Sequence, residues 1–224
     1  MLTHAPWSVL PGLWHGFLDR RQSTGPAGWT VSGATGAPLP VAVPRQVHGA
    51  RVVTSVPGNE PGPADALATA TPGHLVGVVT ADCVPIVLID PRRRVAAAVH
   101  AGWRGAAAGV LEAAVHHLET TWRSRPADLE AVIGPAIGGC CYEIGPEVVT
   151  AFRARTGDLT APAWEERTPR WHVDLRRAVQ LLLHAVGIRD AAILGPCTVC
   201  DPGYHSYRRD GASAGRQLSF VGWA

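Results

Sequence analysis

A cysteine and a histidine flank two short apolar segments that are typical of a buried β-hairpin. Residues 85–89 and 95–99 are rich in β-branched and small apolar residues, and a charged turn over residues 90–94 separates them. Cys83 precedes the first segment and His100 follows the second, so an antiparallel hairpin brings both side chains to the same open end. A thiol and an imidazole placed together can act as a nucleophile and its base, or as two ligands of a metal ion.

His48 is the third residue that could complete this chemistry. It lies in an expected turn at the end of a strand, and alone it would be an ordinary polar residue. Together with Cys83 and His100 it gives three nitrogen and sulfur ligands with an open fourth position, which describes a catalytic zinc site. Asp82 could orient a histidine ligand, act as a base or simply cap the turn. We therefore expect these four residues to be catalytic and the first three to bind the metal.

Anion recognition is predicted just after the hairpin. The glycine-bearing turn at 101–105 opens a segment, 104–122, whose apolar positions follow a helical period. Free backbone N–H groups at a helix start favour anions, and Arg104 adds a planar guanidinium suited to phosphate or carboxylate. Residues 204–210 place two more guanidiniums beside two tyrosines that could stack on a planar ring, although solvated arginines beside core tyrosines are the alternative. The expected substrate-binding residues are Arg45, Arg104, Tyr207, Arg208 and Arg209.

The four remaining cysteines form two pairs, Cys140–Cys141 and Cys197–Cys200. Together they could form a four-cysteine structural zinc site. Adjacent cysteines on a short loop are poorly suited to binding one metal ion tetrahedrally, so small buried or half-exposed thiols are the favoured interpretation. A thioredoxin-type redox motif at 197–200 is weaker still, because this segment does not open a helix after a strand. We expect a single zinc ion and little copper, with Cys140 and Cys141 dispensable for metal binding.

The composition favours a soluble globular protein and excludes several classes of function. The chain has 224 residues, of which 46% are hydrophobic and 17% charged, and this length fits one domain over residues 1–224. A net charge of +2 gives no case for nucleic acid, and no apolar segment is long enough to span a membrane. Lysine is absent, which excludes Schiff-base chemistry and a P-loop lysine. Five cysteines without a signal-peptide pattern indicate a cytoplasmic protein with thiols or metal rather than disulfides.

The remaining segments predict the frame that positions these residues. Strands are expected over residues 14–18, 75–79, 129–133, 191–194 and 218–223, and helices over 146–155 and 174–186. Residues 21–40 and 55–73 are loop-rich connections, dense in glycine and proline, and 156–170 is an irregular connection. Because antiparallel hairpins alternate with crossover helices, the fold class is α+β or mixed α/β, with a sheet covered by helices.

The chain resembles the laccase-domain family, also described as multicopper polyphenol oxidoreductase-type or peptidoglycan editing factor proteins. The resemblance runs from about Trp14 to the C-terminus, and five motifs carry it. They are QVHG at 46–49, TADCVPIVLID at 80–90, AVHAGWRG at 98–105, IGPAIGGCCYEIGPEV at 133–148 and SYRRDGASAGR at 206–216. The joint occurrence of ADC-x-P, HAGWRG and SYRRD in this order is highly specific for the family.

This resemblance implies an α-β-β-α sandwich with mixed sheets in a single compact α+β domain. It also implies a zinc ion held by His48, Cys83 and His100. Family members are similar to purine nucleoside phosphorylases, with adenosine deaminase and methylthioadenosine phosphorylase activity in the same site. The implied partners are a purine nucleoside and phosphate, and the protein would be a monomer or a homodimer. Residues 21–40 depart from the family pattern, because a short Gly/Pro-rich segment replaces a longer stretch.

The sequence leaves four functions open. The first is phosphate-dependent nucleoside cleavage at the expected zinc site. The second is a cysteine hydrolase that acts on an amide such as a wrongly built cell-wall precursor, with Cys83 as nucleophile and His100 as base. The third is a copper oxidase, which is disfavoured because the ten histidines include no His-x-His pair. The fourth is a zinc protein that has lost substrate binding together with the family's usual 21–40 stretch.

Overall fold

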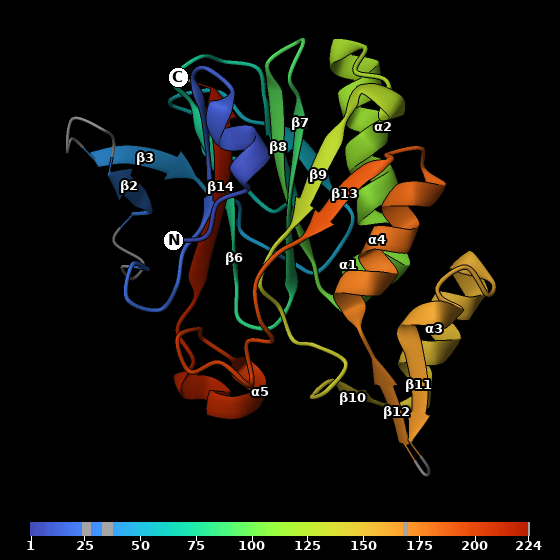
Figure 1. Cartoon of the computed structure of the whole chain (residues 1–224). Helices are drawn as coiled ribbons and strands as arrows, with labels where there is room; N and C mark the ends of the chain where they lie inside the picture. The colour runs from blue at the N-terminus through green and yellow to red at the C-terminus, as the bar shows by residue number, and fades with distance from the viewer. Residues whose placement is uncertain (24–27, 33–37, 168–169, 224) are drawn as a thin grey trace.

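The hairpin that connects Cys83 to His100 lies at the centre of the fold. The computed structural model describes residues 1–23, 28–32, 38–167 and 170–223. Strands β7 (Val84–Asp90) and β8 (Val95–Ala101) pair in antiparallel register, with Pro85 opposite His100. Every residue of both strands is buried, because one face of the hairpin packs against helices and the other against a second sheet. The predicted hairpin is confirmed, and both strands are slightly longer than expected (Figure 1).

A six-stranded mixed sheet extends on both sides of this hairpin, in the order β13-β9-β7-β8-β5-β4. The outer strands are β4 (Val52–Thr54), β5 (Ala66–Thr69), β9 (Glu130–Ile133) and β13 (Asp190–Ile193). Strands β9 and β13 are parallel neighbours, as are β4 and β5, and the other pairs are antiparallel. The predicted strands at β9 and β13 are confirmed. The sequence does not predict β5, because its four residues, Leu67 among three small ones, lie between Pro/Gly-rich segments in the expected 55–73 connection.

A five-stranded sheet packs face to face against the six-stranded sheet, in the order β1-β14-β6-β3-β2. Its strands are β1 (Leu13–Phe17), β2 (Thr30–Ser32), β3 (Pro38–Ala42), β6 (Leu75–Thr80) and β14 (Gln217–Trp223). Buried side chains from both sheets, among them Val87 and Val221, fill the space between them. Strands β1, β6 and β14 match the predicted strands. Part of the expected 21–40 loop instead forms β2 and β3, while residues 24–27 and 33–37 of that stretch lie outside the described residues.

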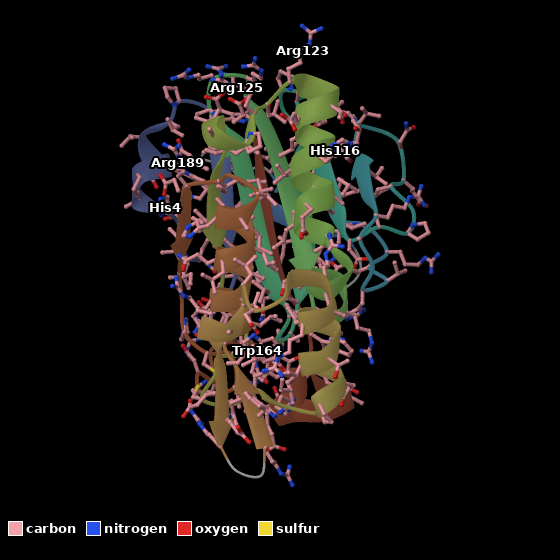
Figure 2. All side chains as sticks on the ribbon, turned by 90° about the vertical axis from the view of Figure 1, so that its right-hand side faces the viewer. His4, His116, Arg123, Arg125, Trp164 and Arg189 are labelled. Carbon is pink, nitrogen blue, oxygen red and sulfur yellow. The ribbon has the colours of Figure 1, made fainter. Side chains whose placement is uncertain are left out.

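Helices cover the other face of the six-stranded sheet, which gives the α+β architecture predicted from the sequence. They are α1 (Trp103–Ala108), α2 (Val110–Trp122) and α4 (Leu175–Ala185). Leu111 and Leu118 of α2 and Val179 of α4 belong to one buried cluster with Ile86 of β7. Figure 2 views this helical layer from the outside, with Arg123 at the upper end of α2. Within the described part of the chain, no helix has the length and apolar character needed to cross a membrane.

The segment predicted as one helix over 104–122 is in fact two helices. The chain breaks at Gly109, whose φ of +89° lies in the left-handed region that favours glycine. A Cβ at this position would also collide with the guanidinium group of Arg155. The single-helix prediction is therefore wrong, because the apolar period continues across a backbone break that only the glycine signals. As a result α1 has six residues, and only α2 forms a longer helix.

A small third sheet and α3 (Pro146–Thr156) lie at the lower right of Figure 1. The strands are β10 (Glu143–Ile144), β11 (Trp164–Arg167) and β12 (Arg170–Val173), in the order β10-β12-β11. Phe152 of α3 packs edge to face on Trp164, which Figure 2 labels. The prediction of an irregular connection over 156–170 is wrong at β11, because the charged sequence of this strand gives no strand signal. The helices predicted at α3 and α4 are confirmed. The short elements are α5 (Tyr207–Asp210), η1 (Ala5–Val9), η2 (Pro126–Asp128), η3 (Ala161–Ala163) and η4 (Gly211–Ser213).

Three links between the two large sheets meet at one end of the molecule. Residues 43–51 join β3 to β4, residues 81–83 join β6 to β7, and residues 194–216 join β13 to β14. All three contribute side chains to one cavity, and the last link carries α5, at the bottom of Figure 1. The first two links hold His48 and Cys83. Two of the three candidate metal ligands therefore lie where the chain crosses between the sheets, and only His100 lies on a strand.

Candidate active site

The structure brings His48, Cys83 and His100 together at the open end of the hairpin. The Sγ atom of Cys83 lies 4.0 Å from Nε2 of His48. The rings of His48 and His100 meet edge to face, with centroids 4.8 Å apart. One nitrogen or sulfur atom of each residue lies within 4.8 Å of those of the other two. The three side chains can therefore reach one metal ion, and two imidazoles with a thiolate are a donor set that suits zinc.

Asp65 supports His48 and His100 through hydrogen bonds. Its fully buried carboxylate accepts hydrogen bonds from the backbone N–H groups of His48, at 2.9 Å, and Gly49, at 2.7 Å. Oδ1 of Asp65 also lies 2.9 Å from Nδ1 of His100. This contact directs the other ring nitrogen of His100 toward the site, as carboxylates hydrogen-bonded to a histidine ligand commonly do. Asp65 is not among the site residues predicted from the sequence, where its only signal is its position immediately before β5.

The ionisation of Cys83 and His100 is coupled. Burial alone would raise the pKa of the Cys83 thiol, but hydrogen bonds with His100 and His48 outweigh burial and lower it to about 6. Burial alone would lower the pKa of His100, but its hydrogen bonds to Asp65 and Cys83 raise it to about 9. Between these two values a thiolate therefore faces an imidazolium, and at neutral pH Cys83 is already in the form that binds metal or attacks an electrophile.

This ionisation predicts an unusual pH dependence for the alkylation of Cys83. In metal-free protein we expect the rate of reaction with iodoacetamide to rise with a midpoint near pH 6, well below the value of about 8.5 that is usual for a free thiol. Peptide mass spectrometry assigns the modification to Cys83. The Asp65→Asn variant should move the midpoint upward, because His100 then loses part of its positive charge. A wild-type midpoint near pH 8.5 would show that the thiolate is not stabilised.

Two glycines after β8, Gly102 at the start of α1 and Gly105 within it, leave space for the candidate metal ligands and their loop. A Cβ on Gly102 would lie 3.0 Å from Cδ2 of His48 and 3.1 Å from Sγ of Cys83. A Cβ on Gly105 would lie 2.9 Å from the backbone oxygen of Gly49. Because both contacts are tighter than a carbon atom normally accepts, larger residues at these positions would move the site apart. This explains why glycines recur in the segment 101–105.

We expect Gly102→Ala to weaken zinc binding while leaving the protein folded. Overpacking of this kind typically costs about 1–3 kcal/mol of stability, and here the strain falls directly on His48 and Cys83. The zinc affinity should fall roughly 10-fold, as outer-shell changes around metal sites typically do; a competition titration with a chelator measures it. Gly49→Ala is the matched control, since a Cβ there would meet its nearest atoms at 3.6 and 3.8 Å. Equal zinc affinities in the two variants would contradict this steric role.

The candidate site opens into a cavity of about 610 Å³. Its lining combines the three sheet-crossing links with the segment after β9. The residues are Pro44, Gln46, His48, Val79, Thr80, Ala81, Asp82, Cys83, His100, Ile137, Tyr142, Tyr207, Arg208 and Arg216. The amide group of Gln46 is fixed by two 2.8 Å hydrogen bonds to the backbone of Val79. Apolar walls, a few oriented polar groups and a reactive centre are the usual features of a small-molecule site.

Asp82 lines the cavity but is hydrogen-bonded to neither histidine. One carboxylate oxygen accepts a hydrogen bond from Oγ1 of Thr198 and the other from the backbone N–H of Arg208, both at 2.6 Å. Its φ of +89° marks the sharp corner between β6 and β7. The hydrogen bonds of both oxygens thus go to the 194–216 link, and a role of Asp82 in orienting a histidine or in catalysis stays a prediction. Asp82 fixes the start of α5 against the corner that carries Cys83.

The five predicted substrate-binding residues separate into two groups. Tyr207 and Arg208 line the cavity. The Arg208 guanidinium donates to the backbone oxygens of Cys141 and Glu143 and lies 5.4 Å from the centroid of the Tyr142 ring. Two residues that line the same wall, Tyr142 and Arg216, are not in the predicted set. Their motifs offered a signal, because both lie in segments that carry the family resemblance.

The other three arginines do not line the cavity. Arg209 donates instead to the backbone oxygens of residues 198, 199, 201 and 204 and to Asp210, so it stabilises the loop beside the site. The guanidinium of Arg104 stacks over the ring of Trp103 at 4.4 Å. Arg45 is exposed, and its backbone pairs with residues 62–64. A role of these three residues in substrate binding stays a prediction: the Arg209 guanidinium binds the neighbouring loop, that of Arg104 stacks on the adjacent ring, and Arg45 is exposed.

The chain matches the sequence model of a known protein family over most of its length. The sequence model of the family described as multi-copper polyphenol oxidoreductase laccase matches residues 28–224. The chain belongs to this family. The match covers all three candidate metal ligands and both arginines of the cavity wall. It confirms the resemblance to the laccase-domain family that the five sequence motifs indicate.

Relatives and a solved structure agree with this assignment. A protein named purine nucleoside phosphorylase from Deinococcus radiodurans is 39% identical over 179 residues, which span 79% of this chain and 68% of the relative. A protein named adenosine deaminase RL5, from an unknown prokaryotic organism, is 37% identical over 162 residues, spanning 70% of this chain and 61% of that protein. The crystal structure of YlmD from Geobacillus stearothermophilus matches with a TM-score of 0.80 at 28% identity, covering 96% of this chain and 93% of YlmD. The laccase-domain fold therefore extends over nearly the whole chain.

Proposed function

We propose that this laccase-domain protein is a zinc-dependent purine nucleoside phosphorylase that cleaves adenosine, inosine or methylthioadenosine with phosphate. The observation that carries the proposal is the convergence of His48, Cys83 and His100 in the lining of a cavity that Arg208 and Arg216 also line. A donor set for a Lewis acid thus faces cationic groups suited to an anionic co-substrate. The relatives named purine nucleoside phosphorylase and adenosine deaminase support the same substrate class.

Each group has a distinct role in this proposal. His48, Cys83 and His100 would hold the zinc ion, which when bound supplies Lewis-acid polarisation of a substrate oxygen or nitrogen. The aromatic faces of Tyr142 and Tyr207 suit stacking on the planar purine. Arg216 and Arg208 would position phosphate for attack on the ribose carbon while the base leaves. Most of the rate acceleration would then come from positioning and charge stabilisation, without a covalent enzyme intermediate.

Product analysis with adenosine tests this function. The protein is incubated with adenosine in phosphate buffer and in phosphate-free buffer, and the products are separated by chromatography. We expect adenine and ribose 1-phosphate, formed only when phosphate is present. Inosine and ammonia, formed in either buffer, would reveal the adenosine deaminase activity that we propose as a second reaction of the same site. Equal rates of base release in both buffers, or free ribose as the sole product, would rule out phosphorolysis.

A second candidate function is a cysteine hydrolase acting on an amide, and one observation favours it. Asp65, His100 and Cys83 form a connected carboxylate–imidazole–thiolate series in which the thiolate is stabilised near neutral pH. This hydrolase would need neither zinc nor phosphate, and it would form an acyl group on Cys83. Mass spectrometry after incubation with cell-wall amides distinguishes the two functions, since the phosphorylase forms no acyl-enzyme.

Copper oxidase chemistry, which the family description suggests, is not part of this proposal. Among the described residues, two groups of side chains could hold a metal, namely His48–Cys83–His100 and a set of four cysteines. Coupled copper centres need more histidines than either group offers, and blue-copper sites commonly add a weak axial methionine. The sole methionine of the chain, Met1, lies next to Gly16, on β1. Both donor sets therefore suit zinc better than an oxidase copper centre.

We expect Arg216→Met to raise the KM for phosphate. A charge-assisted hydrogen bond is worth about 1.5–3 kcal/mol, which corresponds to an increase of roughly 10- to 100-fold. Steady-state kinetics at varied phosphate measure the change, while zinc content should stay at the wild-type value. Arg104→Met is the matched comparison, because Arg104 stacks on Trp103 outside the cavity lining. A raised phosphate KM in Arg104→Met alone would place the anion at the start of α1, as the sequence predicts.

A further inference from the structure

The four cysteines outside the active site lie on two adjacent loops. Cys140 and Cys141 follow β9, and Cys197 and Cys200 follow β13. Because β9 and β13 are parallel neighbours, the loops leave the sheet side by side. They contact each other directly through a bridge between Ala136 and Cys197. The topology therefore brings together residues that are about 60 positions apart in the sequence.

The four sulfur atoms form a compact group. Sγ of Cys200 lies 3.4 Å from that of Cys141 and 3.7 Å from that of Cys140. All four sulfur atoms lie within 4.8 Å of one another. Zinc–sulfur bonds of about 2.3 Å in a tetrahedron place the sulfur atoms roughly 3.8 Å apart. The spacing of the group is therefore close to that of a four-sulfur metal site, although all four residues are free cysteines.

The objection that adjacent cysteines cannot serve one tetrahedral site does not hold in this turn. The backbone N–H groups of Cys141 and Tyr142 both donate to the oxygen of Gly138, which folds the chain back so that both side chains face the same loop. The absence of a side chain on Gly138 makes room for this packing, since a Cβ there would lie 3.2 Å from Cβ of Cys197. The N–H group of Gly138 also donates to Sγ of Cys197 at 3.2 Å. Such N–H donors commonly orient metal-ligating groups.

We propose that Cys140, Cys141, Cys197 and Cys200 bind a second zinc ion in a closed, four-sulfur structural site that joins the loops after β9 and β13. Closed four-cysteine sets are typical of structural zinc, and the Cys-x-x-Cys spacing of one pair is common in them. The ion would take no direct part in the nucleoside reaction. Its protein ligands fill all four positions, so it leaves no place for a substrate.

This ion would stabilise the arginine side of the cavity. Arg208 donates to the backbone oxygen of Cys141, and Arg209 donates to those of Thr198 and Val199. Both loops that carry the cysteines are thus held to α5, which presents Arg208 to the cavity. Metal binding would remove freedom from both loops at once, since such a site forms only in the folded chain.

The Cys83→Ala variant isolates the second site, because it removes the sulfur ligand of the first. We expect this variant, purified without a metal-affinity tag, to retain one zinc ion per chain by elemental analysis. Its zinc X-ray absorption spectrum should fit four sulfur ligands at about 2.3 Å. Absence of bound metal, a fit that requires nitrogen or oxygen ligands, or iron in place of zinc would overturn the proposal. A mass lower by two hydrogens would also overturn it, since it would show a disulfide instead.

Substitution of Cys200 provides the reciprocal test in the otherwise native chain. Wild-type protein should carry two zinc ions and Cys200→Ser one, while Cys200→His should keep both, because histidine can replace cysteine as a zinc ligand. Hydrogen exchange of residues 138–144 and 197–204 should be faster in Cys200→Ser than in Cys200→His. Equal zinc content in wild type and Cys200→Ser would refute the site even if the Cys83→Ala variant failed to fold.

Discussion

Replacing Cys83 by serine should lower kcat/KM for adenosine phosphorolysis by at least about 100-fold, which is the upper end of the cost of disturbing even an outer-shell group at a metal site. Cys83 is the only sulfur atom in the His48–Cys83–His100 group, and its thiolate is stabilised by both histidines. A serine hydroxyl stays protonated at neutral pH and is a poor zinc ligand. The zinc content should therefore fall by one ion per chain together with the activity, as measured by elemental analysis and steady-state kinetics.

The Cys83→His variant is the control for this result. A third imidazole is an accepted zinc ligand, so this variant should regain zinc that the serine variant lacks. It would remain inactive as a cysteine hydrolase, which needs the sulfur atom itself. Full zinc content and full activity in Cys83→Ser would contradict the assignment of Cys83 as a ligand. Recovery of zinc without any phosphorolysis in Cys83→His would favour a catalytic role for the thiolate.

Asp65→Asn should weaken zinc binding by roughly 10- to 100-fold, although Asp65 touches no substrate. The carboxylate orients His100 through Nδ1 and accepts from the backbone of His48 and Gly49, so one residue positions two of the three candidate ligands. An asparagine cannot accept at both oxygen positions, and a buried donor left without a partner costs about 1–3 kcal/mol of stability. A competition titration with a chelator measures the zinc affinity, and denaturant unfolding measures the stability.

Asp90→Asn is the matched control for this variant. Asp90 is equally buried at the opposite end of the same hairpin, where it accepts from the backbone N–H groups of Arg92 and Arg93. Its substitution should lower the free energy of unfolding without changing the zinc affinity. If both variants lose zinc equally, the effect of Asp65 is one of general stability. If neither does, Asp65 does not position the ligands.

The central hairpin could be predicted because its sequence carries the signal of its environment. Continuous apolar runs mark strands that are buried on both faces, and the charged turn at 90–94 separates them. The same geometry predicts that Cys83 and His100 meet. Strand β5 and its neighbour Asp65 could not be predicted in this way, since four residues, three of them small, are too few to show a period between Pro/Gly-rich segments. Asp65, which supports the site, was therefore missed because the strand that follows it carries no clear sequence signal.

The arginines show a second limit of sequence reasoning. Arg208 and Arg209 are adjacent and chemically identical, yet the first lines the cavity and the second binds backbone oxygens of the neighbouring loop. Which residue faces the substrate depends on the rotation of α5, and the sequence of a four-residue helix does not determine it. The four cysteines are a similar case, because their proximity depends on the parallel pairing of β9 and β13, which is not local.

The location of the site in links between the two sheets has a consequence for how its reactivity can change. His48, Cys83 and α5 each belong to a segment that starts on one sheet and ends on the other. The distances among them therefore depend on how one sheet slides or rotates over the other, which the inter-sheet side chains control. Substitutions at such remote positions, among them Val87 and Val221 of the buried cluster between the sheets, are therefore expected to alter substrate range or turnover. Directed evolution of this protein should therefore include the buried positions between the two sheets as well as the residues that line the cavity.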